Sequence, residues 1–182
     1  KGTKTHQPTC IVKLEQDGIT GYGEAPAISY YNTTVEIIIQ ELEELSRKLG
    51  NYHLTTPELL YSKLEEILPH SSFSRCAVDI AAHDWFAKRQ AVPLWQSLGL
   101  LWKEPLVTDF TIGMDTIENM LGKMNELQWP IYKIKLGNEN DLEVISAIHS
   151  QTNSKIRVDA NAAWSLEKAL RLVPELEKFD IE

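Results

Sequence analysis

Ile131-Tyr132-Lys133-Ile134-Lys135-Leu136-Gly137 is the stretch of sequence that decides the fold class. Side chains along a β-strand point alternately to two faces, so the apolar residues at 132, 134 and 136 share one face, and Lys133 and Lys135 share the other. Strands of a parallel sheet are usually covered on both faces and are therefore apolar throughout. The stretch is predicted to be a strand with one buried face and one face that carries charge.

Similar strand openings recur along the C-terminal half of the chain. They lie near Val107, Ile131, Lys155 and Phe179, about 24 residues apart, with helical patterns between them. Crossovers of this length predict a parallel sheet, with three complete strand–helix units and the start of a fourth strand. No GxGxxG follows the first strand and no P-loop motif is present, which disfavours the nucleotide-binding folds. A closed barrel and an open doubly wound sheet both fit these units.

The first part of the chain has a different order of elements. Two runs over 9–14 and 19–24 flank the turn pair Asp17-Gly18 and predict a β-hairpin. Helical patterns follow, and strands before helices are typical of an α+β domain. We expect this domain to span residues 1–105, with its N-terminal strand missing, and the strand–helix repeat to span 106–182 and to stop within the fourth strand.

Three helices are predicted in the first domain. The first covers 35–49, with Thr33-x-x-Glu36 as its capping box and Gly50 as its end. The second begins at Pro57, after Thr56 as its cap. The third covers 74–89, and its small alanines would let it lie close to a neighbouring element.

Composition excludes several classes of partner. The 182 residues carry 18 basic and 26 acidic side chains, a formal charge of −8, and no Lys/Arg-rich cluster, which argues against a nucleic-acid partner. No apolar stretch approaches the roughly 20 residues of a membrane span. Cys10 and Cys76 lack paired spacing, so we expect reduced thiols in the core and a cytoplasmic protein. Lys1 opens the chain in place of Met, and we expect a piece of a longer protein, for which a homo-oligomer stays open.

Polar residues gather on one face of the predicted sheet. In Arg157-Val158-Asp159-Ala160-Asn161 the polar side chains alternate with apolar ones, and Asp109 and Thr111 repeat the pattern on the first strand. In a barrel this face would be the interior, and the strand C-termini would line an active site. The alternative is that these strand ends are simply solvated, and the residues alone favour neither interpretation.

A carboxylate beside two lysines suggests a particular chemistry. Carboxylate oxygens suit Mg²⁺, which leaves coordination positions open for a substrate carboxylate. A lysine becomes a useful base when neighbouring positive charge lowers its pKa. The combination suits removal of a proton next to a carboxylate, with a metal stabilising the enediolate.

At these residues the sequence resembles the enolase superfamily, and within it the muconate-lactonizing subgroup, which carries Lys-x-Lys and Asp-x-Asn on consecutive barrel strands. Residues 21–25, Gly-Tyr-Gly-Glu-Ala, and the alanine-rich segment 74–81 are similar to parts of that family's capping domain. The resemblance implies an α/β fold with a TIM-type (β/α) barrel, of which only the first three units are present, preceded by an α+β capping domain.

The resemblance also implies roles for individual residues. Lys135 would be the proton-abstracting base and Lys133 the neighbouring cation that lowers its pKa. Asp159 would be the first Mg²⁺ ligand. Asn161 matches a second polar position, as a substrate contact or as a cap for the following helix.

Two further residues are implied in substrate binding. Thr111 corresponds to an inward threonine of the dipeptide epimerases, and Tyr30 lies in a loop, 28–32, at the position of a specificity loop; packing at an interface is the alternative for Tyr30. The chain departs from the family because it lacks the later strands that carry two more acidic ligands and a second lysine. Glu182 lies closer to Asp159 than the family spacing allows.

The function implied is a Mg²⁺-dependent epimerisation of dipeptides, an isomerase reaction on a small carboxylate substrate. A cycloisomerase or an o-succinylbenzoate synthase of the same superfamily fits the same residues. A noncatalytic remnant of the fold and an unrelated parallel α/β domain are the alternatives from other classes.

Overall fold

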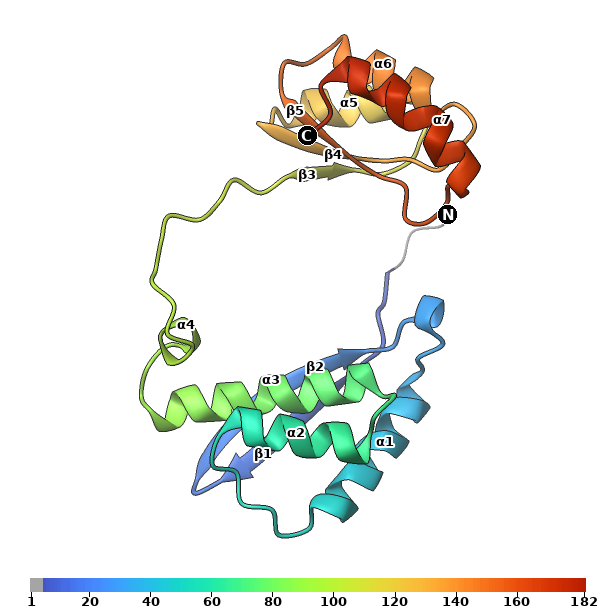
Figure 1. Ribbon diagram of the computed structural model, residues 1–182. Coiled ribbons are helices and arrows are strands. Elements are labelled where there is room, and N and C mark those ends of the chain that lie inside the picture. Colours follow the sequence, from blue (N-terminus) through green and yellow to red (C-terminus); the bar gives the residue numbers. More distant parts are fainter. Residues whose placement is uncertain (1–4) are drawn as a thin grey trace. The chain divides into compact units, whose positions relative to one another are not determined.

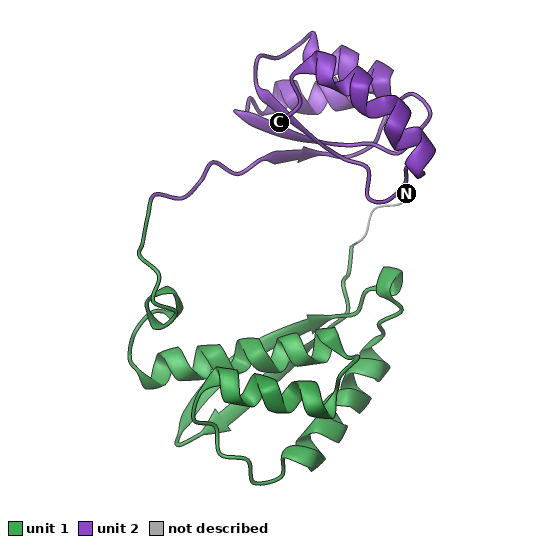
Figure 2. Cartoon of the chain, in the orientation of Figure 1, with its two compact units in different colours: residues 1–103 green, residues 104–182 purple. Residues whose placement is uncertain are grey.

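The computed structural model describes residues 5–182 and divides the chain into two compact units, with the boundary between Lys103 and Glu104 (Figure 2). Each unit has hydrophobic clusters of its own.

The first unit opens with an antiparallel hairpin, as predicted. β1 (Thr9–Gln16) pairs with β2 (Ile19–Pro26) from Thr9 opposite Pro26 to Gln16 opposite Ile19. The connecting residues Asp17 and Gly18 have φ of 53° and 74°, which a two-residue hairpin of matching twist requires. Each strand runs two residues further at its C-terminal end than the sequence indicated.

Three long helices follow the hairpin (Figure 1). They are α1 (Val35–Leu49), α2 (Pro57–Ile67) and α3 (Ser72–Arg89), after a single turn η1 (Ser29–Tyr31) and before the short α4 (Leu94–Ser97). All three long helices confirm the sequence prediction, and α3 begins two residues earlier than expected.

The helix starts show why two caps were predicted with different success. Thr56 accepts a hydrogen bond from the backbone N–H of Leu59, as predicted. The cap of α1 is Thr34, which accepts from Ile37, so the prediction of Thr33 is wrong by one residue. Adjacent threonines offer two equivalent hydroxyls, and spacing alone does not choose between them.

Close contact between β2 and α3 organises the first unit. A Cβ added at Gly23 would lie 1.9 Å from the carbonyl oxygen of Ala77, and one added at Gly21 would lie 2.0 Å from that of Ala81. Both alanines are fully buried, which confirms that the small residues of α3 serve close packing. Trp85 also ties α3 to β1, because its indole N–H donates to the carbonyl of Gln16 at 3.0 Å.

The second unit is a parallel sheet covered by helices (Figure 1). Its strands are β3 (Phe110–Ile112), β4 (Ile131–Lys135) and β5 (Lys155–Asp159), in that order across the sheet, and both pairings are parallel, as predicted. The connecting helices are α5 (Ile117–Glu126), α6 (Asp141–His149) and α7 (Leu166–Leu176).

One face of this sheet forms the core of the second unit. Tyr132, Ile134 and Leu136 are at most 2% exposed, together with Ile112 and Ile156 from the neighbouring strands. They pack with buried residues of the helices, namely Met120, Met124, Val144, Ile145, Ile148 and Leu176. The alternate residues of each strand point to the other face of the sheet, and most of them are polar.

Two strand predictions in this unit need correction. The first strand begins at Phe110, and Val107, where an opening was expected, is 55% exposed. The expected strand opening at Phe179 is a 3-10 turn, η2 (Glu177–Phe179), followed by Asp180 with φ of 49°. Phe179 packs against the core and the ring of His149, so its apolar character reflects a helix end, and only Ile181 bridges to Ile156.

Two expectations from composition are also resolved. None of the helices described over residues 5–182 is long and apolar enough to cross a membrane. Both cysteines are free thiols, but only Cys10 is half-buried, and the expectation of a core position is wrong for Cys76, which is exposed on α3.

We predict that Gly23→Ala destabilises the first unit by about 3 kcal/mol, because its methyl group would collide with the backbone of α3, which cannot move without displacing the core. Gly122→Ala is the matched control: nothing lies within 4 Å of its Cβ position on α5, and alanine should raise stability there by up to about 1 kcal/mol. Differential scanning calorimetry measures both; equal effects would contradict the close β2–α3 contact.

Candidate functional site

The polar face of the second unit collects side chains from all three strands. Thr111, Lys133 and Arg157 stand opposite one another in the register, and Lys135 stands opposite Asp159 in the next polar row. Polar residues that are distant in sequence therefore line one side of the sheet, as the alternation predicted. Asp159 and Asn161 lie at the C-terminal end of β5, where parallel α/β folds place their ligands.

Asp159 is the centre of a compact charged cluster. Its Oδ2 lies 2.7 Å from Nζ of Lys135 and 3.0 Å from Nζ of Lys133. The side chains are about one quarter to one third exposed, at 24% for Asp159, 27% for Lys135 and 34% for Lys133. The cluster is thus open to a ligand and yet bound to a rigid sheet.

The neighbours of Asp159 fix its charge. The Lys135 ammonium lowers the pKa of the Asp159 carboxyl most, and the backbone N–H of Asn161 and the Lys133 ammonium lower it further, to well below its usual range. Asp159 therefore stays a carboxylate throughout the pH range in which proteins are normally folded. A permanent negative charge at the end of β5 is available to a cation.

Asn161 completes the cluster from the loop after β5. Its backbone N–H donates to Oδ1 of Asp159 at 2.8 Å, and its side-chain Oδ1 accepts from Lys135 at 2.9 Å. Asn161 and Ala162 have φ of 45° and 58°, a turn that asparagine tolerates well. The alternative of a helix cap is wrong, because Ser165 caps α7 by accepting from the N–H of Lys168.

The two remaining predicted residues lie in different units. Thr111 is exposed on β3 directly beside Lys133 in the register. Tyr30 belongs to the first unit, in η1, where it is 72% exposed and packs edge-on against Tyr31 with ring centroids 4.9 Å apart. A substrate role for either residue stays a prediction.

The cluster fits a hard divalent cation in the kind of ligand it offers. Asp159 supplies carboxylate oxygens and Asn161 an amide oxygen, which are ligands that Mg²⁺ prefers. Within residues 5–182, however, no group of three or more His, Cys, Asp or Glu is placed to hold a metal. The described part of the chain therefore offers part of a ligand set for such an ion.

A buried carboxylate, which the sequence analysis did not single out, holds the loops beside the cluster in place. Asp141, 2% exposed, accepts hydrogen bonds from the backbone N–H groups of Gly137 and Asn138, each at 2.9 Å, and from the indole of Trp164 at 2.7 Å. It thereby ties the loop after Lys135 to the loop after β5. The sequence offers one signal for Asp141, its place in the first turn of a helix that follows a glycine. Many exposed acidic residues share this position, so the signal is weak.

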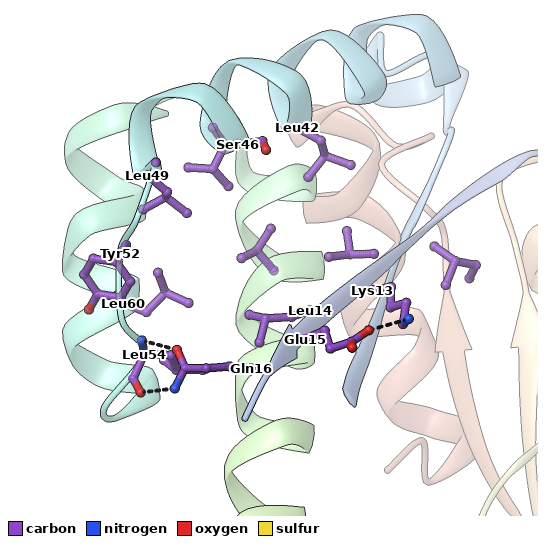
Figure 3. Close-up of a pocket in the computed structure, with 15 residues that line it drawn as sticks. Lys13, Leu14, Glu15, Gln16, Leu42, Ser46, Leu49, Tyr52, Leu54 and Leu60 are labelled. Carbon is purple, nitrogen blue, oxygen red and sulfur yellow. Dashed lines mark hydrogen bonds and ion pairs between the residues drawn. The ribbon is translucent and has the colours of Figure 1, made fainter. Parts of the chain in front are cut away.

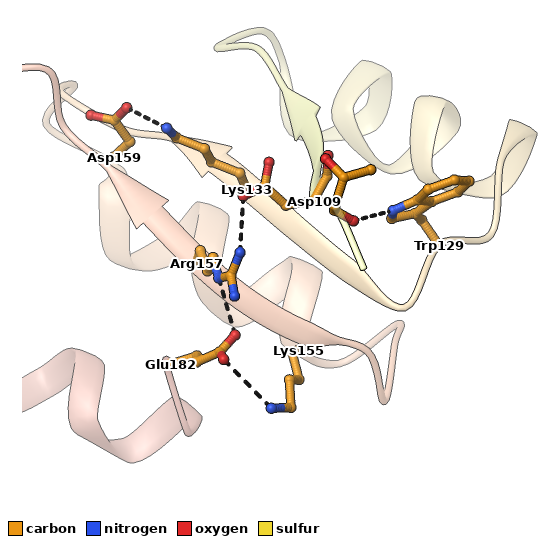
Figure 4. A network of polar contacts seen from close by, with 8 residues as sticks. Asp109, Trp129, Lys133, Lys155, Arg157, Asp159 and Glu182 are labelled. Atoms are coloured by element: carbon orange, nitrogen blue, oxygen red, sulfur yellow. Dashed lines mark hydrogen bonds and ion pairs between the residues drawn. The ribbon is translucent and has the colours of Figure 1, made fainter. Parts of the chain in front are cut away.

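The polar face carries a second charged network further from the C-terminal ends of the strands. This lower network consists of Asp109, Lys155, Arg157 and Glu182. Arg157 donates to Oδ2 of Asp109 at 3.2 Å and to Oε2 of Glu182 at 3.0 Å, and Lys155 lies 3.5 Å from Oε1 of Glu182. Figure 4 shows Lys133 directed at Asp159 and Arg157 directed at Glu182. Hydrogen bonding to Arg157 holds the pKa of Glu182 below its usual value, so both partners are charged.

The first unit contains a cavity of about 470 Å³ between β1 and the helices, which none of the predicted site residues lines. Figure 3 shows its mainly aliphatic wall, including Leu42, Leu49 and Leu60. The polar side chains there are paired: Lys13 with Glu15 at 2.6 Å, and Gln16 with the backbone of Leu54 in both directions. The ionisable cluster therefore lies elsewhere, on the sheet of the second unit.

Two family models match the chain. Residues 1–99 match the mandelate racemase / muconate lactonizing enzyme N-terminal domain, and residues 115–182 match the enolase C-terminal domain-like family. Among curated proteins, the L-Ala-D/L-amino acid epimerases of Maribacter sp. and Flavobacterium johnsoniae are 40% and 36% identical over 176 residues. Each match covers 97% of this chain and 52% of the relative, so the chain spans about half the length of the curated relatives it matches.

Solved structures agree with this. An L-Ala-D/L-Glu epimerase superposes with a TM-score of 0.81 at 26% identity, over 95% of this chain and 54% of its own. The dipeptide epimerase of Cytophaga hutchinsonii, complexed with Mg and the dipeptide D-Ala-L-Val, superposes with a TM-score of 0.87 over 96% of this chain and 50% of its own. At 24% identity, the second likeness shows the fold.

We predict that Asp141→Asn destabilises the second unit by about 2 kcal/mol at pH 7, because an amide cannot accept all three buried hydrogen bonds. Burial is the largest single influence on the pKa of Asp141 and raises it, but these hydrogen bonds together with Lys168 outweigh it and leave the pKa lowered. The carboxylate therefore stabilises the fold above its unfolded pKa of about 3.9, and this contribution is lost as pH falls through the lower folded value.

Urea unfolding between pH 3 and 7 measures the effect, with Glu143→Gln, an exposed acid on the same helix turn, as the control. The difference between Asp141→Asn and the original protein should be full at pH 7 and shrink below about pH 4. A difference that is independent of pH would contradict the role of the charge.

Proposed function

The chain belongs to the mandelate racemase / muconate lactonizing enzyme family of the enolase superfamily, and from this membership and the geometry of the site we propose that it is part of a dipeptide epimerase. The observation that carries the proposal is the contact of Lys133 and Lys135 with a single carboxylate, Asp159, at the C-terminal edge of a parallel sheet. The names of the relatives support the substrate class, because both are L-Ala-D/L-amino acid epimerases.

The proposed chemistry inverts a stereocentre next to a carboxylate. Lys135 is the proposed general base for the α-proton: the C–H bond breaks, the proton passes to Nζ, and the electron pair moves into the substrate carboxylate to give an enediolate. Lys133, in the same row as Thr111, places its ammonium where it can bind that carboxylate. Return of a proton to the opposite face completes the epimerisation, and in the family that step uses a second lysine on a later strand.

Asp159 is the proposed Mg²⁺ ligand of this chain, and Asn161 orients it through its backbone N–H. Mg²⁺, when bound, supplies positive charge that stabilises the enediolate. We propose that the other ligands come from parts of the protein outside these residues, since the chain spans about half of its relatives.

The same reasoning extends to the architecture. We propose that β3, β4 and β5 are the first three strands of a (β/α) barrel whose interior is the polar face, and that the first unit is the capping domain. The α5 and α6 crossovers between parallel neighbours support the barrel, as does the likeness in fold to solved family members. The proposed protein is cytoplasmic and acts on a small molecule, with its oligomeric state open.

We predict that the intact protein with Mg²⁺ exchanges the α-proton of an L-Ala-containing dipeptide for deuterium in D₂O, seen as a one-dalton gain by mass spectrometry. Lys135→Ala should lower the exchange rate at least about 100-fold, because it removes the general base. Lys123→Ala, which removes an exposed lysine on α5, is the matched control and should exchange at the original rate.

The products distinguish the alternatives. Both epimers appearing with the label would identify the epimerase, whereas no exchange in a panel of dipeptides would favour a cycloisomerase or o-succinylbenzoate synthase. Exchange that survives Lys135→Ala would contradict the assignment of the base.

We also predict that Asp159→Asn weakens Mg²⁺ binding at least about tenfold, since it removes a charged ligand. Isothermal titration calorimetry with MgCl₂ on the intact protein measures this, and Asp115→Asn, at an exposed aspartate before α5, is the control. Unchanged binding by Asp159→Asn would support the alternative in which the polar strand ends are merely solvated.

A further inference from the structure

Arg157 lies on the same face of the same strand as the proposed metal ligand. Arg157 and Asp159 are two residues apart on the strand. At a rise of about 3.3 Å per residue, their backbone positions are about 7 Å apart. An arginine side chain spans that distance. Arg157 therefore has a carboxylate within reach at its own strand end, and yet it does not bind it.

Two other carboxylates hold the guanidinium in place. Asp109, just before β3, accepts from its Nη1 at 3.2 Å, and Glu182, after η2, accepts from its Nε at 3.0 Å. These partners come from both sides of β5, one by way of β4 and one from the chain beyond α7. Figure 4 shows the Arg157 side chain pointing toward this lower network.

An arginine would bind Asp159 differently from a lysine. Asp159 already contacts Lys133 and Lys135, but each lysine meets it through a single ammonium nitrogen. A guanidinium stays charged at every accessible pH and binds carboxylates in a two-point fork. Pairing of Arg157 with Asp159 would occupy the lone pairs that a divalent cation needs.

We propose that Asp109 and Glu182 are positioning residues that hold Arg157 away from Asp159 and so keep Asp159 available to a divalent cation. The inference rests on the proposed function, because it assumes that Asp159 binds Mg²⁺. It assigns the lower network a task in the site rather than in stability alone.

The test uses substitutions that remove charge with little change of shape. In the intact protein, Asp109→Asn/Glu182→Gln should raise the Kd for MgCl₂ about tenfold by calorimetry, the size of effect that changes behind a metal ligand produce. Adding Arg157→Gln to that pair should restore the Kd to within about twofold of the original. A crystal structure of the double variant should show Arg157 against Asp159.

Rescue separates this role from a purely structural one. If Asp109 and Glu182 only support the fold, the triple variant will bind Mg²⁺ as weakly as the double variant, and the proposal is overturned. An unchanged Kd in the double variant overturns it as well. Asp17→Asn, in the hairpin turn of the other unit, is the matched control and should leave the Kd unchanged.

Mg²⁺ binding by the unsubstituted protein tests the proposed function separately from the inference. If that protein does not bind MgCl₂, the proposed function fails and the inference fails with it. If it binds MgCl₂ and the double variant binds equally well, only the inference fails. Should the double variant unfold, Asp109→Asn and Glu182→Gln alone, each with and without Arg157→Gln, give the same comparison.

Discussion

The alternation of side chains along a β-strand is the constraint on which the second unit depends. On β4 it sends Tyr132 and Ile134 under the helices and Lys133 and Lys135 to the opposite face. Because neighbouring strands are parallel and in register, the same parity on β3 and β5 builds one apolar face and one polar face. Packing and chemistry thus occupy the two sides of a single sheet, and a one-residue slip would exchange them.

The position of the cluster depends equally on the loops that follow the strands. Lys135 and Asp159 are the last residues of β4 and β5, where backbone pairing ends. Asp141 binds the loop after β4 by two backbone hydrogen bonds and the loop after β5 through Trp164. A buried acid with satisfied hydrogen bonds can therefore fix the geometry of a site that it does not touch.

Sequence reasoning succeeded where one physical signal dominated. The period of about 24 residues predicted the parallel sheet, and the turn pair Asp17-Gly18 predicted the hairpin, because both patterns have few alternatives. It failed where two residues were equivalent locally, as with Thr33 and Thr34, and at Phe179, where an apolar residue served a helix end. The roles of Asp141 and Arg157 could not be assigned, because they depend on partners more than twenty residues away in the sequence. These partners are Trp164 for Asp141, and Asp109 and Glu182 for Arg157.

The distribution of charge over the polar face follows from register and gives the face two distinct parts. Three carboxylates and four cationic side chains lie there, and nothing in their numbers decides how they pair. Register sets the rows: Lys135 lies opposite Asp159, and Lys133 lies opposite Arg157. From that row Lys133 reaches Asp159, while Arg157 pairs with Asp109 and Glu182. The guanidinium of Arg157 is thereby held between two carboxylates, and the two lysines meet Asp159 at the C-terminal end of the sheet.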